Sequence, residues 1–318
     1  MSVCVLSPGA LTTVQDGGRN GYGYLGFNAS GVMDERAYRI ANALVGNFTD
    51  EAVLEMAMLG GRFEFTAPCL FAVTGADMGA TLSGEEIRMY QTIFADEGDV
   101  LAFSAAKTGF YTYIAFAGGI DVEPVLGSRS TNLKCGIGGF QGRKLQKGDV
   151  LTLREPALPP ERLPRVRVPA ESYAGDAAEV RVVLGPQNDY FTKAGLQTFL
   201  SAPYRVTANT DRMGCKLDGA KIEYKDGVDI ISDGIVFGSI QVPPAGTPMV
   251  MLADRQTTGG YAKIATVVSA DLPKLVQRRP GDTVYFHAVS AHQAEKLYKK
   301  EQRALDRLLL RYGKDLVR

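Results

Sequence analysis

Short apolar segments rich in β-branched and aromatic residues place the strongest constraint on how this chain can fold. Each is bounded by Gly, Asp or Pro, as expected of strands that end in tight turns. The segments are 63–65, 70–74, 100–103, 110–116, 150–153, 180–184, 249–252, 264–268 and 283–286. Because strands do not alternate regularly with long helices, a doubly wound parallel sheet fits poorly. The pattern predicts a mainly β protein made of antiparallel barrels or sandwiches.

Helices are expected at two places. One is predicted from about Asp34 to Val45, where apolar residues recur at helical spacing, Asp34 can cap the first turn and Gly46 can stop the helix. The other is predicted from about Ser290 to Tyr312, where apolar residues gather on one side and basic residues on the other.

A Pro-rich stretch between Arg154 and Glu179 has the composition of an extended connector. The expected division is a first domain at 1–155, a connector at 156–178, a second domain at 179–287 and a C-terminal helix at 288–318. Gly-Asp turns precede strands at Gly98, Gly148 and Gly281, on both sides of the connector. Their repetition suggests two related β domains.

The charge balance and the cysteine usage exclude several classes of partner. Lys plus Arg and Asp plus Glu each total 35, so no net field attracts a nucleic acid or an anionic membrane surface. The 4 cysteines lie far apart in the sequence and only 2 histidines are present, so neither a zinc site nor a disulfide framework is expected. Free cysteines fit a cytoplasmic protein.

A GxGxxG pattern from Gly21 to Gly26 matches a dinucleotide-binding fingerprint in its letters only. That fingerprint needs a strand directly before its first Gly and a helix that begins at its end. Here turn residues precede the pattern, and the expected helix starts too late to point its N-terminus at a pyrophosphate. We therefore do not expect dinucleotide binding. A P-loop is excluded because no GxxxxGK[ST] motif occurs.

Four polar, Gly-rich regions are more specific than plain connectors. They are Pro8 to Arg19, Thr74 to Asp77, Leu126 to Arg143, and a group formed by Thr210 to Gly214, Gly238 to Pro244 and Ala253 to Tyr261. Asp77 and Asp254 each follow an apolar strand, a position where binding sites tend to form. The Ser, Thr and Arg residues of the third region could hold a carboxylate or a phosphate. Each region alone could equally be a turn with a capping Asp, but together they favour a ligand role.

These same regions closely resemble the biotin-dependent carboxyltransferase-like family, also labelled allophanate hydrolase subunit 2. The motifs occur in order as PGALTTVQDGGRNGYGYLGFNASGVMD from Pro8, TGAD from Thr74, AGGIDVEPVLGSRST from Ala117, GIGGFQGRKLQKGD from Gly136, TDRMGCKLDG from Thr210, GSIQVPPAGTP from Gly238 and ADRQTTGGYAKIATV from Ala253. The resemblance extends from the first residues to about Phe286.

The resemblance implies two tandem cyclophilin-like β-barrel domains with a C-terminal helix. It also implies partners, namely a homologous cyclophilin-like subunit and a lactam-hydrolase subunit. Family members open 5-oxoproline to glutamate with ATP, transfer a carboxyl group from biotin to urea, or regulate a histidine kinase. Because the chain has no biotin-attachment motif and no fused carboxylase or amidase region, the C subunit of an ATP-dependent 5-oxoprolinase is the leading hypothesis. A biotin-dependent carboxyltransferase acting on urea or a similar small amide, and a non-enzymatic kinase regulator, are the alternatives.

For the leading hypothesis, the expected substrate is a small anionic amide and the expected cofactor is ATP, used together with partner subunits. Biotin is not expected to be attached to this chain, and no metal can be named from the sequence. The catalytic candidates are Asp16, Asp77, Asp254 and Arg212, whose carboxylates would orient a metal or a proton and whose Arg would clamp an anion. The substrate-binding candidates are Gln15, Arg19, Arg129, Ser130, Arg255, Gln256, Thr257 and Tyr261.

Overall fold

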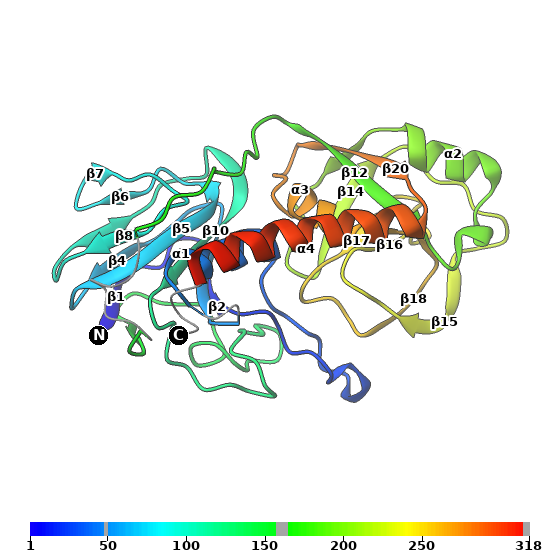
Figure 1. The fold of residues 1–318 in the computed structure, drawn as a ribbon. Coiled ribbons are helices and arrows are strands. Elements are labelled where there is room, and N and C mark those ends of the chain that lie inside the picture. Colours follow the sequence, from blue (N-terminus) through cyan, green and yellow to red (C-terminus); the bar gives the residue numbers. More distant parts are fainter. Residues whose placement is uncertain (48–49, 157–164, 314–318) are drawn as a thin grey trace. The chain divides into compact units, whose positions relative to one another are not determined.

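The computed structural model describes residues 1–47, 50–156 and 165–313 and divides into two compact units (Figure 1). Unit 1 contains Met1–Asn20, Ser30–Ala174 and the chain from Ala304 onward; unit 2 contains Gly21–Ala29 and Gly175–Arg303. The change from Ala174 to Gly175 falls inside the expected connector 156–178, of which 157–164 lie outside the described residues. The chain is mainly β, as predicted, and each predicted strand segment overlaps a strand, although β5 and β12 extend three residues beyond the predicted bounds at one end.

Unit 1 is built from two antiparallel sheets. The first has the order β11 (Val150–Thr152), β1 (Ser2–Ser7), β4 (Arg62–Phe65), β9 (Val100–Ala102), β6 (Thr81–Leu82) and β7 (Glu85–Glu86). The second has the order β2 (Leu11–Gln15), β3 (Val53–Ala57), β10 (Thr108–Phe116), β5 (Cys69–Asp77) and β8 (Ile93–Ala95).

The two sheets of unit 1 meet at a corner where three chain segments cross from one sheet to the other. These segments join β1 to β2, β3 to β4 and β9 to β10, and they bond to one another. Ala10 N donates to Leu59 O at 3.1 Å and Ala106 N donates to Met58 O at 2.7 Å. Gly9 has a φ of +70°, and a Cβ there would lie 2.3 Å from the Leu59 oxygen, so only Gly fits.

Both sheets bury their inner faces in one core. Phe65 of the first sheet packs against Phe71 and Phe116 of the second, with ring centroids 5.2 and 6.1 Å apart. All three side chains are fully buried. Since burial of one such ring contributes roughly 1.5–3 kcal/mol, this aromatic cluster is a main source of stability for unit 1.

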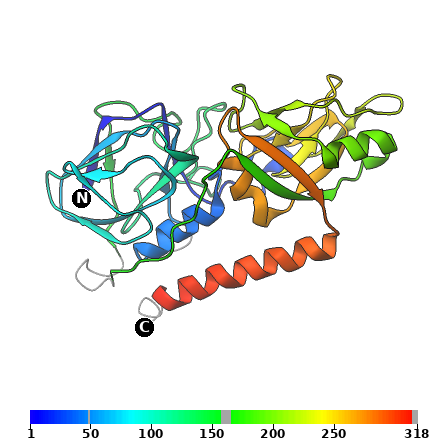
Figure 2. The same cartoon turned by 90° about the horizontal axis from the view of Figure 1, so that it is seen from above.

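Helix α1 (Glu35–Leu44) covers β5 and β10 of unit 1 (Figure 2). The predicted cap is confirmed, because the Asp34 side chain accepts a hydrogen bond from Ala37 N at 2.9 Å. The predicted stop is also confirmed, since Gly46 has a φ of +69° and its N–H donates to Ala43 O at 3.2 Å.

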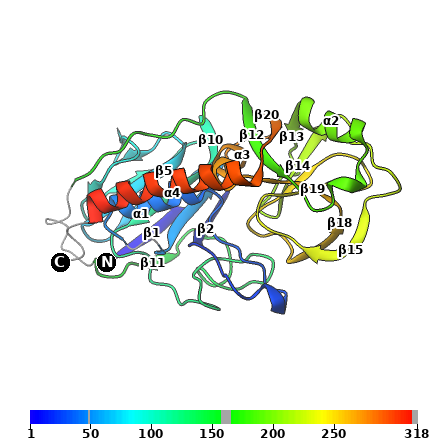
Figure 3. The ribbon, with the colours of Figure 1, turned by 45° about the vertical axis from the view of Figure 1, so that its right-hand side comes forward.

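Unit 2 is a closed barrel with one parallel contact, between β12 and β20, while its other pairs are antiparallel. Around the barrel the order is β12 (Ala177–Leu184), β19 (Lys263–Val267), β16 (Ser239–Gln241), β17 (Met249–Met251), β14 (Gly214–Gly219), β13 (Tyr204–Val206) and β20 (Thr283–Ala288). A separate two-stranded sheet pairs β15 (Asp229–Gly234) with β18 (Thr258–Tyr261), side by side in Figure 3.

Helices α2 (Lys193–Ser201) and α3 (Leu272–Val276) pack on the barrel, α2 against β20 and α3 against β12 (Figure 3). Helix α4 (Ala291–Gly313) is the predicted C-terminal helix, and residues 314–318 lie outside the described ones. Within unit 1, Asp306 of α4 forms an ion pair with Arg39 of α1 at 3.4 Å.

The repeated Gly-Asp turns have the same hydrogen-bond geometry in both units. At each turn, the Gly N–H and the Asp carbonyl bond to one residue of a neighbouring strand, which is Phe65 for Gly98, Val5 for Gly148 and Val206 for Gly281. Each Asp carboxylate also accepts the backbone N–H three residues before it. The sequence repeat therefore marks a repeated structural device.

Candidate functional site

Asp16 follows β2 and is the centre of a buried hydrogen-bond network that we call the Asp16 cluster. Its Oδ1 accepts from Ser128 Oγ at 2.6 Å, from Ser130 Oγ at 2.5 Å and from Gly18 N at 2.9 Å. Its Oδ2 accepts from Arg129 N at 2.5 Å. Asp16 is 6% exposed. The Ser128 and Ser130 hydroxyls and the Arg129 N–H, which were expected to bind a ligand, are hydrogen-bonded here to the Asp16 carboxylate.

Arg19 and Gln15 fasten the same segment from the other side. Arg19 is 1% exposed; its Nε donates to Val125 O and its Nη2 to Ser130 O, both at 3.0 Å. Gln15 is fully buried, and its Nε2 donates to Thr131 O at 3.2 Å. These side chains add hydrogen bonds to backbone carbonyls of the 125–131 loop.

Arg129 is half-buried, and its Nε donates to Val122 O at 3.2 Å. Its neighbour Ser130 is fully buried. A Cβ at Gly138 would lie 2.2 Å from Ser130 O, so Gly is required where the following loop packs on this segment. The structure thus gathers Gln15, Asp16, Arg19, Arg129 and Ser130 into one closely packed group within unit 1.

Arg212 and Asp254 form a second polar group, in unit 2. Arg212 Nε lies 2.9 Å from Asp254 Oδ2, and Nη2 lies 3.3 Å from Oδ1, so the pair is bidentate. Arg212 is 6% exposed. The backbone repeats the link, because Asp254 N donates to Arg212 O at 2.8 Å. Asn28 Nδ2 donates to Asp254 O at 3.0 Å, so the Gly21–Ala29 segment is attached to this loop within unit 2.

The remaining candidates of unit 2 follow Asp254 in the sequence. Arg255 Nε donates to Ile235 O at 3.2 Å, and burial lowers the pKa of the Arg255 guanidinium while Asp254 opposes that shift. Thr257 is half-buried and its carbonyl accepts from Ile235 N at 3.0 Å. Gln256 is exposed. Tyr261, at the end of β18, is also exposed.

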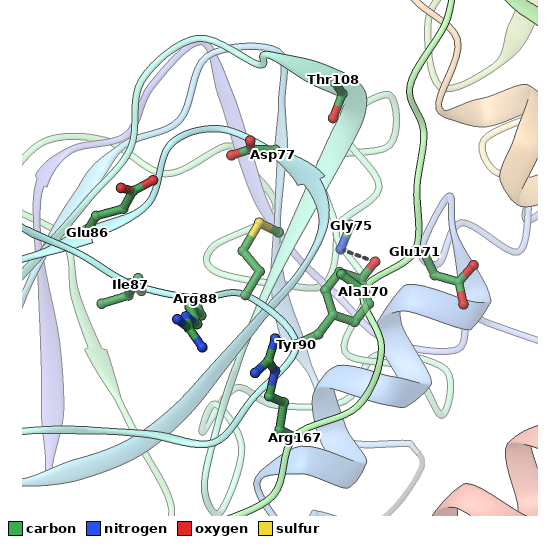
Figure 4. Close-up of a pocket in the computed structure, with 11 residues that line it drawn as sticks. Gly75, Asp77, Glu86, Ile87, Arg88, Tyr90, Thr108, Arg167, Ala170 and Glu171 are labelled. Atoms are coloured by element: carbon green, nitrogen blue, oxygen red, sulfur yellow. Dashed lines mark hydrogen bonds between the residues drawn. The ribbon is translucent and has the colours of Figure 1, made fainter.

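Asp77, at the end of β5, lines a pocket of about 480 Å³ in unit 1, which we call the Asp77 pocket (Figure 4). Its walls come from the end of β5, from β7 and the segment between β7 and β8, from the start of β10, and from residues 167–171 of the expected connector. The lining residues are Gly75, Asp77, Glu86, Ile87, Arg88, Met89, Tyr90, Thr108, Arg167, Ala170 and Glu171.

Backbone pairing explains why Arg167 reaches this pocket. Thr92 N donates to Val166 O at 2.8 Å, and Val168 N donates to Tyr90 O at 3.0 Å. Val166 and Val168 are buried while Arg167 between them is exposed, as expected of an extended segment with alternating faces. Residues 166–168 of the expected connector therefore pair with residues 90–92 and place the Arg167 side chain at the pocket.

A buried chain of hydroxyl groups supports the inner side of the Asp77 pocket. Tyr90 OH accepts from Gly75 N at 3.0 Å and is hydrogen-bonded to Tyr173, whose OH donates to Asp34 Oδ2 at 2.8 Å. Burial raises the pKa of Tyr90 and of Tyr173 well above the usual range, and the Asp34 charge adds to both shifts. Both phenols stay protonated, so they act as fixed hydrogen-bonding groups that tie the pocket to the cap of α1.

Charged groups of both signs line this pocket. Asp77 Oδ1 accepts from Gly79 N at 2.8 Å. Glu171 is paired with Arg36, with Nη2 and Oε1 2.7 Å apart. Within the described residues, the guanidinium groups of Arg88 and Arg167 take part in no hydrogen bond or ion pair. The sequence pattern indicated Asp77 but not Arg88 or Arg167. For Arg167, the alternation of Arg and Val at 165–168 was the available signal.

Other kinds of site receive little support. Among the described residues, no cluster of three or more His, Cys, Asp or Glu side chains could hold a metal ion. Burial raises the pKa of the Cys69 and Cys215 thiols to about 12, as expected of cysteines that serve as apolar packing. In the described part of the chain, no helix has both the length and the apolar character needed to span a membrane.

Comparison with known proteins identifies relatives along nearly the whole chain. The chain is 34% identical to the C subunit of the Escherichia coli 5-oxoprolinase, over 96% of this chain and 97% of that protein. It is also 34% identical to the corresponding 5-oxoprolinase C subunit of Haemophilus influenzae, over 96% of each. Among solved structures, it matches the urea carboxylase of Kluyveromyces lactis with a TM-score of 0.91 and 30% identity, over 96% of this chain.

The chain spans 29% of that urea carboxylase, so the likeness concerns one part of a longer enzyme. The family model described as carboxyltransferase domain, subdomain A and B, matches residues 25–288. This match takes in most of both units. The chain therefore belongs to the carboxyltransferase domain family, subdomains A and B.

Proposed function

We propose that this chain is the C subunit of an ATP-dependent 5-oxoprolinase and that it works with partner subunits to open 5-oxoproline to glutamate. One observation carries the proposal: the identity to the E. coli C subunit covers 96% of this chain and 97% of that protein. The two proteins therefore correspond along their whole lengths, and both units are accounted for.

The chemistry explains why several polar groups are needed. The five-membered lactam of 5-oxoproline is an unstrained amide whose closure is favoured by entropy, so complete opening requires coupling to ATP. Transfer of the γ-phosphoryl group from ATP to the lactam oxygen would release ADP and activate the lactam carbon. Water would then add to that carbon, and the C–N bond would break with a proton passing to the nitrogen. A second water would release phosphate from the resulting acyl phosphate, and fixed donors must stabilise the charge that develops. The enzyme must also bind the substrate carboxylate.

We assign the substrate to the Asp77 pocket and not to the Asp16 cluster. The Asp16 carboxylate already accepts four hydrogen bonds, from Ser128, Ser130, Arg129 N and Gly18 N, and it is buried. The Asp77 carboxylate accepts one hydrogen bond, from Gly79 N, and lines a pocket of a size suited to a small molecule. In the proposal, Asp77 orients the amide or its proton. The Arg212–Asp254 pair remains a second candidate group for anion binding or proton transfer, with Arg255, Gln256, Thr257 and Tyr261 near it in the sequence.

The partners in the proposal are a homologous cyclophilin-like subunit and a lactam-hydrolase subunit. ATP is used jointly with them, and no biotin is attached to this chain. We also propose a cytoplasmic location, where ATP is supplied.

The test is to purify the chain together with these partners and to measure ATP consumption and glutamate release with and without 5-oxoproline. The proposal expects ATP consumption that depends on 5-oxoproline and on the presence of this chain. A reconstituted complex that hydrolyses ATP at the same rate without this chain would contradict it.

A biotin-dependent carboxyltransferase is the second candidate, and the similarity to the K. lactis urea carboxylase supports it. That function would require a biotinylated carrier protein and urea or a similar small amide. Carboxyl transfer from such a carrier, together with no response to 5-oxoproline, would favour the second candidate.

A further inference from the structure

Arg88 and Arg167 give the Asp77 pocket an unused positive side. They come from two segments far apart in the sequence, and Figure 4 shows both guanidinium groups in the pocket, below Asp77 in that view. Both residues are exposed, and within the described residues neither side chain has a hydrogen-bonding or ionic partner. Glu171 does not neutralise them, because it is paired with Arg36 at 2.7 Å. Two neighbouring guanidinium groups match the oxygens of one carboxylate or phosphate.

The opposite side of the pocket accepts hydrogen bonds. Asp77 Oδ1 accepts a hydrogen bond from Gly79 N at 2.8 Å. Within the described residues, Asp77 Oδ2 takes part in no hydrogen bond or ion pair. Thr108 lies opposite Asp77 in the β5–β10 ladder, so its hydroxyl is close to the same end of the pocket. Glu86 adds a second carboxylate (Figure 4). A ligand with only negative groups would be repelled by this side, whereas an N–H group would be bound.

The pocket is held in shape before any ligand arrives. Tyr90 is 1% exposed, and its OH is fixed by Gly75 N at 3.0 Å. Gly75 has a φ of +86°, and a Cβ there would lie 2.3 Å from Tyr111 O, so the wall at this point must be bare backbone. A preformed wall lowers the entropy lost on binding.

From these features we infer that the Asp77 pocket binds a small carboxylic acid that carries an N–H group beside the acid. Arg88 and Arg167 bind the carboxylate, and Asp77 accepts the N–H. 5-Oxoproline has both groups on one small ring, so the inference rests on the proposed function and names the part of the chain that would recognise that substrate.

Binding to the full-length chain, measured by calorimetry, tests the inference with four probes. These are 5-oxoproline, 3-oxocyclopentanecarboxylate, in which a CH₂ replaces the N–H, 2-pyrrolidinone, which lacks the acid, and ATP. We expect 5-oxoproline to bind roughly tenfold or more tightly than either single-group probe, because each lost charged hydrogen bond is of that order. Arg88→Gln and Arg167→Gln should each weaken 5-oxoproline binding by roughly tenfold. Arg165→Gln is the matched control, since Arg165 is exposed beside Arg167 but does not line the pocket.

Equal affinities for the three ring probes, or unchanged affinity in both Arg variants, would overturn the inference. If the two Arg variants lost ATP binding but kept 5-oxoproline binding, the inference would also be overturned, because the two Arg residues would then bind a phosphate.

Turnover by the reconstituted complex separates this inference from the proposed function. If the wild-type complex uses 5-oxoproline, Arg167→Gln should raise its KM roughly tenfold and Arg165→Gln should leave it unchanged. A normal KM in Arg88→Gln and Arg167→Gln complexes overturns the pocket assignment while the proposed function stands. A wild-type complex without 5-oxoproline turnover contradicts the proposed function, and the calorimetric comparison then decides the pocket by itself.

Discussion

Asp16 and Asp77 have the same local geometry and different surroundings. Each follows a strand of unit 1, and each accepts the N–H of a Gly two residues later, Gly18 at 2.9 Å and Gly79 at 2.8 Å. Asp16 then gains donors from a segment more than a hundred residues away and is 6% exposed. Asp77 stays half-buried at a pocket. The position of an Asp at a strand end therefore does not determine its role. The tertiary partners decide whether its carboxylate supports the fold or is available to a ligand.

The largest expected effect comes from breaking the Asp16 cluster. In Asp16→Asn, an amide NH₂ replaces the Oδ2 that accepts from Arg129 N, so this charge-assisted hydrogen bond is lost. The Arg129 N–H then faces another donor at a buried position. The free energy of unfolding should fall by about 3–5 kcal/mol, as when a buried charged partner is removed. Denaturant unfolding measures this change. Asp77→Asn is the matched control, and its free energy of unfolding should fall by about 0.5 kcal/mol or less. Equal losses in the two variants would remove the distinction between the two carboxylates.

The Arg212–Asp254 pair extends the comparison to unit 2. Arg212→Gln leaves the mostly buried Asp254 carboxylate without its bidentate partner, so unfolding should become easier by about 2–3 kcal/mol. The double variant Arg212→Gln/Asp254→Asn should recover part of that loss, as measured in a double-mutant cycle. Strict additivity of the two single changes would mean that the pair does not stabilise the loop.

The Tyr173 hydroxyl tests whether the buried support of the Asp77 pocket matters. Tyr173→Phe removes the 2.8 Å bond to Asp34 and the link to Tyr90, and should cost about 1–1.5 kcal/mol of stability. It should also raise the KM for 5-oxoproline a few-fold, because Tyr90 loses its fixed position. Tyr298→Phe, at an exposed tyrosine of α4, should change neither quantity. A Tyr173→Phe protein that loses stability but keeps its KM would separate the network from the pocket.

The smallest effect is expected at an ion pair near the surface. The hydrogen bonds from Arg143 hold the pKa of Asp149 below its usual value, and the bond from Gln146 N acts in the same direction. A carboxyl whose pKa is lowered by folding stabilises the fold above its unfolded pKa of about 4, and this contribution disappears as the pH falls below that value. Because the pair is partly solvated, Asp149→Asn should remove under about 1 kcal/mol at pH 7 and almost nothing at pH 2. A loss that grows toward acid pH would have the wrong sign.

Local patterns predicted the strands with continuous apolar runs and the two longest helices, because burial and turn chemistry depend on neighbouring residues. Strands such as β2, β3 and β16 were not among the predicted segments. The short helix α2 was not expected: it contains Gly195 and is held mainly by Phe199, which stacks on Phe286 at 4.9 Å. That contact is tertiary and leaves no periodic signal in nine residues. The Gly21–Ala29 segment was expected in the first domain, yet it belongs to unit 2, where Asn28 bonds to Asp254 O.

The candidate site was predictable in its residue types more than in its positions. The sequence indicated that the region of Ser128 and Ser130 could hold the carboxylate or phosphate of a ligand, whereas in the fold both hydroxyls are hydrogen-bonded to Asp16. Arg88 and Arg167 approach one pocket only because residues 165–168 pair with residues 90–92. Such pairings bring together segments that carry no common motif.

In our proposal, Asp77 binds the substrate and is not needed for the stability of the fold, and the variant Asp77→Asn separates these two roles. Asp77→Asn keeps the Oδ1 that accepts from Gly79 N, so its unfolding free energy should match that of the wild type within about 0.5 kcal/mol. In the reconstituted complex, we expect its 5-oxoproline-dependent ATP consumption to fall by roughly tenfold or more. Wild-type turnover by a folded Asp77→Asn complex would contradict the account.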